Sequence, residues 1–211
     1  MKIAILGGTF DPVHNGHLTV ARSVVQAFDI DELHFVPAFC PPHKHRSEVT
    51  SPFHRFAMVA LATASDSCFR VSAIETDTLG PRYSVDTLGL MHQQYQESQF
   101  LFVTGTDMYG EIEEWKDYAR LFALASFVVV HRPGFPMRKD IARFETLEPE
   151  MRISLSESAE SRSVYYLPWL HQEASSTRIR EAAALNQDPG QWVPREVALY
   201  IQRHRLYQTD H

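Results

Sequence analysis

The stretch Ile3–His17 reads IAILGGTFDPVHNGH and decides the fold. Its first residues, Ile3–Leu6, form a short apolar run that ends at a glycine pair, which is typical of a strand buried on both faces of a parallel sheet. The pair Gly7-Gly8 permits a sharp turn and lets backbone N–H groups approach a ligand closely. We therefore expect a strand, a tight loop and then a helix that carries Leu18 on its apolar face.

Two histidines, His14 and His17, stand three residues apart at the start of that helix. A helix N-terminus carries partial positive charge and unpaired backbone N–H groups, so an anion bound there meets these groups and the imidazole donors together. A glycine pair is a common way to end a strand, so by itself it predicts phosphate binding poorly. The complete arrangement is far more specific.

The stretch GGTFDPVHNGH resembles the signature loop of the nucleotidyltransferase superfamily, (T/S)-F-D-x-x-H-x-G-H. The matching residues are Thr9, Phe10, Asp11, His14, Gly16 and His17. The resemblance implies that the loop binds ATP through Gly7, Gly8, Thr9, Phe10, His14 and His17. It also implies that the two histidines are catalytic and that Thr9 contacts the second substrate.

The composition is that of a globular protein. The chain has 211 residues, 44% of them hydrophobic, which suffices for one domain with a substantial core. No apolar run approaches the ~20 residues of a membrane helix. A strand at the first residues leaves no room for a signal peptide, so we expect the protein to be located in the cytoplasm. Cys40 and Cys68 lack zinc-type spacing and are expected as free thiols. The net charge of −6 argues against broad nucleic-acid binding, which needs a basic face.

A second expected strand, Glu32–Pro37, is followed by the loop CPPHKHRSE. In an arbitrary loop such cationic side chains are most often solvated surface. Here PPHK resembles the element by which nicotinate mononucleotide adenylyltransferases reach substrate phosphates, which implies that Lys44 is a phosphate ligand and a catalytic cation. A helix is expected over 51–64. Arg55 in its first turn opposes the helix dipole, so it reaches either an acidic partner or the mononucleotide, and we assign it to the mononucleotide.

The stretch ETDTLGPRYSVDTLGLM follows a third expected strand over 69–74, and Ser84 is expected to be the N-cap of a helix that begins near Val85. It resembles the family element E-x-x-R-x-G-x-S-Y-T-x-x-T-L. The matches are Glu75, Gly80, Tyr83, Thr87 and Leu88, whereas Thr78, Arg82 and Ser84 replace arginine, serine and threonine. The resemblance implies that Tyr83 and Ser84 bind the mononucleotide.

A fourth expected strand over 99–104 ends in the tripeptide GTD. An aspartate there often only caps the next helix. The family's G-x-D element implies instead that Gly105 and Asp107 contact the nucleotide. Trp115 has charged neighbours and is expected on a mostly wet surface, where an indole can stack on a planar ligand. The family places a tryptophan here against the pyridine ring.

Strands are also expected over 126–131 and 164–167, and a final helix from Pro194 to about His204. Residues 138–162 are charged and weakly patterned, and we expect a surface helix with a variable connection and no function. The stretch ASSTRIR places consecutive hydroxyl residues before a helix over 179–185, which supplies an N-cap and short donors. It resembles the family's I-S-S-T-x-I-R motif, which implies that ATP phosphates bind Ser175, Ser176, Thr177 and Arg180, the last as a catalytic cation.

Strands alternate with helices from end to end, which predicts an α/β fold, a Rossmann-like doubly wound parallel sheet in a single domain. The domain would span 1–211, and its C-terminal helical part, about 175–207, would carry the SSTRIR motif. The resemblance implies transfer of the AMP moiety of ATP to nicotinate mononucleotide, giving deamido-NAD and pyrophosphate. The cofactor would be Mg²⁺, bound largely through phosphate oxygens and not by a protein metal site.

Other functions stay open at this point. A sister adenylyltransferase would use nicotinamide mononucleotide or another phosphorylated acceptor, and a non-catalytic module would bind nucleotides without turnover. A dinucleotide-binding dehydrogenase would show G-x-G-x-x-G, which is absent. The expected partners are ATP and nicotinate mononucleotide, with no nucleic acid and no membrane, and the sequence leaves a homo-oligomer open.

Overall fold

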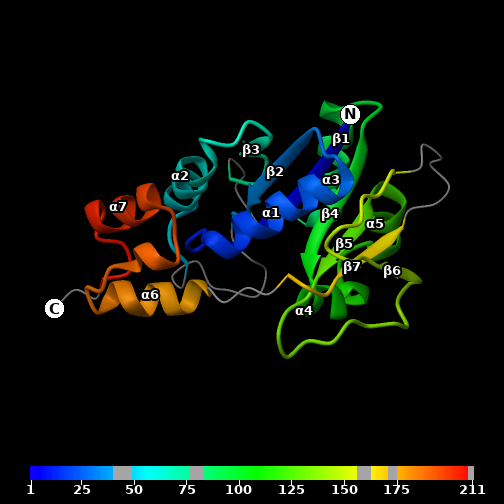
Figure 1. The fold of residues 1–211 in the computed structure, drawn as a ribbon. Helices are drawn as coiled ribbons and strands as arrows, with labels where there is room; N and C mark the ends of the chain where they lie inside the picture. Colours follow the sequence, from blue (N-terminus) through cyan, green and yellow to red (C-terminus); the bar gives the residue numbers. More distant parts are fainter. Residues whose placement is uncertain (40–48, 77–82, 156–162, 171–174, 209–211) are drawn as a thin grey trace.

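The computed structural model describes residues 1–39, 49–76, 83–155, 163–170 and 175–208 (Figure 1). Its helices and strands are β1 (Lys2–Gly8), α1 (Asn15–Phe28), β2 (Glu32–Pro37), α2 (Pro52–Thr63), β3 (Phe69–Val71), α3 (Ser84–Gln94), β4 (Gln99–Gly105), α4 (Thr106–Gly110), η2 (Ile112–Glu114), α5 (Tyr118–Leu124), β5 (Ser126–Val130), β6 (Phe144–Thr146), β7 (Val164–Leu167), α6 (Ser176–Ala184), η3 (Pro189–Gln191) and α7 (Arg195–Arg203). Within the described ranges no helix is long and apolar enough to cross a membrane.

The strands form one parallel sheet in the order β3-β2-β1-β4-β5-β7-β6. β1 lies inside it, and Ile3 pairs with Glu32 of β2 on one side and with Phe100 of β4 on the other. The chain order reverses between β1 and β4, and in open parallel sheets this reversal opens a crevice at the carboxyl ends of the strands. The predicted Rossmann-like α/β fold is therefore confirmed.

Successive side chains of β1 point to opposite faces of the sheet. Each face is covered by helices, so these side chains pack in two separate cores. Ala4 and Leu6 pack in a core that also contains residues of α1, α2, α6 and α7. Ile3 and Ile5 pack in a second core with residues of α3, α4 and α5. Figure 1 shows α2, α6 and α7 gathered at one side of the molecule, although α2 is far from the other two in sequence.

β3 is shorter than predicted and ends at Val71 instead of residue 74. The N–H of Leu33 donates to the carbonyl of Cys68, and the N–H of Ser72 donates to the carbonyl of Phe35. The next bond of this ladder would need an N–H on Pro37, and proline has none. The last residue of β2 therefore stops the neighbouring strand as well.

The prediction of a surface helix in 138–162 is wrong for the described part, residues 138–155, which forms strand β6 and no helix. Phe144 of β6 packs edge-on against Tyr166 of β7 with ring centroids 5.9 Å apart. The Arg138 side chain bonds the carbonyl of Gly110 at 2.9 Å. These tertiary contacts hold an extended path along the sheet edge that the local charge pattern does not reveal.

Candidate active site

A cavity of about 710 Å³ opens at the carboxyl ends of β1, β4 and β5. Its lining contains the predicted site residues Gly7, Gly8, Thr9, Phe10, His14, His17, Tyr83, Ser84, Gly105, Asp107, Trp115, Ser175, Ser176, Thr177 and Arg180. Lys44 and the family-element positions 78, 80 and 82 lie outside the described residues. The fold thus gathers four separate sequence motifs around a single space.

Phe10 fixes the shape of the signature loop. Its backbone lies in the left-handed region, with φ of 49°, which is costly for a residue with a side chain and is kept only where the surroundings enforce it. The ring is buried and packs edge-on against the His17 imidazole, with centroids 5.0 Å apart. A methyl group on Gly8 would lie 3.0 Å from the Phe10 ring, a contact tighter than usual, so a side chain there would press on the ring.

The two histidines form a stacked pair at the N-terminus of α1. Their ring centroids are 3.7 Å apart, and His14 is the N-cap residue of the helix. The backbone N–H of His14 donates to Nδ1 of His17 at 3.2 Å. Because that nitrogen accepts a hydrogen bond, neutral His17 carries its proton on Nε2 and can donate it to a ligand.

Both imidazoles are neutral at pH 7. Burial and the positive charge of Arg132 lower the pKa of His14 from 6.5 to about 4. Burial, with smaller effects of His14 and Arg132, lowers the pKa of His17 well below its usual range. As neutral rings, the two imidazoles each carry one N–H that can donate to a phosphate.

Arg132 is a cavity residue that the sequence analysis missed. It follows β5, and its Nε lies 3.2 Å from Oδ1 of Asp107, which follows the neighbouring strand β4. A side chain at Gly105 would overlap both groups, so the close approach of the pair needs that glycine. Its position at the end of a parallel strand next to the G-x-D element was the signal that could have found it.

The SSTRIR residues contact the signature loop directly. The Ser176 hydroxyl donates to the carbonyl of Pro12 at 3.0 Å, and Nη1 of Arg180 donates to the carbonyl of Asp11 at 2.8 Å. Ser175 is the N-cap of α6, because its side chain accepts from the Arg178 N–H, and the helix begins at Ser176, three residues before the predicted start at Ile179. The hydroxyl proton of Ser176 is thus already used within the protein, whereas Arg180 keeps further N–H groups for a ligand.

Another part of the cavity lining is formed by Trp115 and the start of α3. The indole is partly buried, not on a wet surface as expected, because its edge packs against Phe102 with centroids 6.1 Å apart. Helix α3 begins at Ser84, so its N-cap is Tyr83 and not Ser84 as predicted. Nζ of Lys116 lies 4.9 Å from the Tyr83 ring centroid and forms an ion pair with the Asp86 carboxylate at 3.0 Å.

Arg55 has a different role from the predicted one. Its side chain is completely buried and is not part of the cavity lining. The guanidinium donates to the carbonyls of Thr50, Thr9 and Phe39 at 2.8, 2.6 and 2.8 Å. Arg55 therefore links three loop segments through their backbone carbonyls, outside the cavity lining, and does not contact the mononucleotide as predicted.

The charges around the cavity bear on metal binding. Within the described lining the acidic residues are Asp11, Glu75, Asp107, Glu111 and Glu114, and the basic ones are Lys116, Arg132 and Arg180. No three His, Cys, Asp or Glu side chains of the described part are grouped so that they could hold a metal ion.

Comparisons with known proteins agree with this geometry. The sequence pattern of the cytidylyltransferase-like family matches residues 5–182. A protein of Tropheryma whipplei (strain TW08/27) named "Probable nicotinate-nucleotide adenylyltransferase" is 41% identical over 206 residues, 97% of this chain and 98% of that protein. A protein of the same name from Geotalea uraniireducens (strain Rf4) is 37% identical over 219 residues, 98% of each chain. The solved structure of Plasmodium falciparum nicotinic acid mononucleotide adenylyltransferase complexed with NaAD has a TM-score of 0.73 at 18% identity, covering 98% of this chain and 97% of that one.

Proposed function

This chain belongs to the cytidylyltransferase-like family and, within it, to the nicotinate-nucleotide adenylyltransferases, and from this premise we infer its reaction. It transfers the AMP moiety of ATP to nicotinate mononucleotide, giving deamido-NAD and pyrophosphate. The observation that supports this activity best is the single cavity with two chemically different ends. One end offers backbone and imidazole donors at a helix N-terminus, which suits a polyphosphate. The other offers an indole, which suits a planar ring.

We assign the ATP phosphates to the end formed by the signature loop and α6. The N-terminus of α1 with its neutral histidines, Arg132 and Arg180 converge there from three chain segments. The mononucleotide takes the end formed by Tyr83, Ser84 and Trp115. The first N–H groups of α3 attract a carboxylate, which favours the acid over the amide.

The chemistry asks for alignment and charge neutralisation, not for a covalent intermediate. The attacking phosphate has a second pKa near ~6 and is largely ionised at neutral pH, so no base is required. In-line attack at the α-phosphate needs the two substrates held end to end, which one continuous cavity allows. Nε2–H of His17 and the guanidinium of Arg180 then donate to oxygens on which negative charge develops.

Adenylyl transfer from ATP also requires a divalent metal, which we infer to be Mg²⁺. ATP and the mononucleotide together bring roughly five to six negative charges at neutral pH. The described lining supplies three cationic side chains, and its acidic residues oppose them. When bound with the nucleotide, the ion would neutralise this excess, and phosphate oxygens and water would be its main ligands. Asp107, a carboxylate of the cavity lining, would support its hydration shell.

End-point product analysis tests this function. The protein is incubated with ATP, Mg²⁺ and, in separate reactions, nicotinate mononucleotide, nicotinamide mononucleotide or pantetheine phosphate. Mass spectrometry should detect deamido-NAD and pyrophosphate in equal amounts in the first reaction. Product only with another acceptor would indicate a sister adenylyltransferase. Binding of both substrates without pyrophosphate release would indicate a non-catalytic module.

A further inference from the structure

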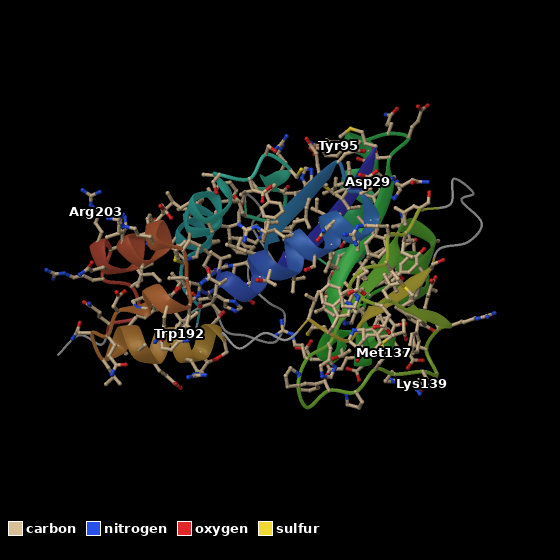
Figure 2. The ribbon with its side chains drawn as sticks, viewed as in Figure 1. Asp29, Tyr95, Met137, Lys139, Trp192 and Arg203 are labelled. Carbon is tan, nitrogen blue, oxygen red and sulfur yellow. The ribbon has the colours of Figure 1, made fainter. Side chains whose placement is uncertain are left out.

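The C-terminal segment holds the signature loop through backbone groups. Besides the bonds from Ser176 and Arg180, the N–H of Asn15, the first residue of α1, donates to the carbonyl of Trp192 at 2.8 Å. Trp192 lies beside α6 in the C-terminal part of the molecule (Figure 2). The loop that carries the histidines is thus docked on residues that follow it by more than 160 positions.

The Asp11 carboxylate adds a side-chain connection to the same segment. It is buried, with 4% of its surface exposed. Oδ1 accepts from the hydroxyl of Tyr207 at 2.8 Å, and Oδ2 accepts from the backbone N–H of Thr50 at 3.2 Å. A hydrogen bond to a carboxylate is stronger than one between neutral groups, and a buried carboxylate oxygen without a partner is costly.

The backbone of Tyr207 is constrained where its hydroxyl contacts Asp11. Its backbone lies in the left-handed region with φ of 66°, which a tyrosine keeps only where other contacts impose it. Burial and the negative charge of Asp11 raise the pKa of its hydroxyl far above the usual range, so the group remains a donor at any working pH. Tyr207 is not among the residues that line the cavity.

We propose that Tyr207 is a positioning residue, whose hydroxyl holds Asp11 and thereby sets the geometry of the His14–His17 pair. Asp11 stands three residues before His14, and its carbonyl is the acceptor for Arg180. Displacing the carboxylate therefore disturbs the N-terminus of α1 and the ATP-side arginine together. The proposal rests on the adenylyltransferase activity inferred above and adds a residue outside the cavity to it.

A purely stabilising role is the competing explanation, and it predicts different measurements. If Tyr207 only stabilises the fold, its loss lowers the melting temperature and leaves the turnover of folded enzyme unchanged. If it positions the loop, its loss lowers kcat and raises the KM for ATP at temperatures where the variant is fully folded. The KM for the mononucleotide should change little, because that end of the cavity is built from α3 and Trp115.

The test compares Tyr207→Phe with Tyr200→Phe. Both substitutions remove one hydroxyl from the C-terminal part and keep the ring. Tyr200 bonds Nδ1 of His54 at 2.9 Å, and neither of these residues lines the cavity, so it is a matched control. We expect kcat/KM for ATP to fall ten- to hundredfold in Tyr207→Phe and to stay within twofold in Tyr200→Phe. Equal kinetics for the two variants, each assayed well below its melting temperature, would overturn the proposal.

A second readout does not depend on turnover. Amide hydrogen exchange of residues 13–18 in the ligand-free protein should be at least tenfold faster in Tyr207→Phe than in wild type, and unchanged in Tyr200→Phe. Unchanged exchange in Tyr207→Phe would contradict the positioning role even if the activity fell. If wild type forms no deamido-NAD, the inferred activity is wrong, whereas an active wild type with a normal Tyr207→Phe contradicts only this proposal.

Discussion

Lowering the pH should destabilise the ligand-free protein through the buried histidine pair. The pKa of His14 is lowered by burial from 6.5 to about 4, so between these pH values the unfolded chain binds a proton that the folded chain does not. Protonation therefore favours unfolding. The stability that neutral His14 contributes is fully present above pH 6.5 and is lost as the pH falls towards 4. His17, whose pKa is lowered as well, acts in the same direction.

The size of this effect follows from the shift. A change of 2.5 units corresponds to about 3 kcal/mol at about 1.36 kcal/mol per unit, and roughly 2.5 kcal/mol of it has been lost at pH 4.5. Small domains are stable by only about 5–15 kcal/mol, so the loss is large enough to measure. A bound polyphosphate should reduce it, because its negative charge raises the pKa of both imidazoles.

Urea unfolding of wild type and His14→Asn between pH 7.5 and 4.5 measures the effect. Carboxylates titrate in both proteins, so their contribution cancels in the difference between the two free energies of unfolding. That difference should shift by about 2.5 kcal/mol in favour of the variant as the pH falls to 4.5. Parallel stability curves would refute the inference that His14 is neutral in the folded protein. A saturating non-hydrolysable ATP analogue should bring the curves closer to parallel.

Three kinetic predictions concern individual side chains of the cavity. His17→Ala should lower kcat by about 10²-fold with a smaller effect on substrate binding, and a near-normal kcat would remove His17 from the mechanism. Arg180→Ala should raise the KM for ATP far more than the KM for the mononucleotide. Arg178→Ala is its control, because Arg178 lies over the Trp192 ring, 5.6 Å from the ring centroid. A larger rise in the KM for the mononucleotide than in the KM for ATP would assign α6 to the mononucleotide end of the cavity instead of the ATP end. Wild type should prefer nicotinate to nicotinamide mononucleotide by at least about 10²-fold in kcat/KM, and Trp115→Ala should lower both values in similar proportion. Comparable rates with the two substrates would contradict the role of the α3 N-terminus.

Local sequence patterns were sufficient for most of the architecture. Six of the strands were predicted because buried parallel strands are short apolar runs bounded by glycine, proline or polar residues. The bounds Glu32–Pro37 and Val164–Leu167 agree with the observed β2 and β7. β6 was missed because FET has no apolar run of its own and is extended only through pairing with β7.

The motif residues that line the cavity were also predictable, because they lie in short, contiguous stretches. Thr9, His17 and Ser175 could be named without any knowledge of how their segments meet. The protonation state of the two histidines could not be predicted from the sequence. That both histidines are neutral depends on burial and on Arg132, which comes from a distant strand.

The sequence by itself determined the doubly wound sheet, the loop and helix at its centre and the motifs that face the cavity. Only the tertiary structure decided that Arg55 supports the loops from behind, that Arg132 belongs to the site and that Tyr207 holds Asp11. The physical reason is sequence distance. Periodicity and capping act within one or two turns of chain, whereas the Tyr207–Asp11 bond joins residues 196 positions apart and exists only after the C-terminal segment has docked.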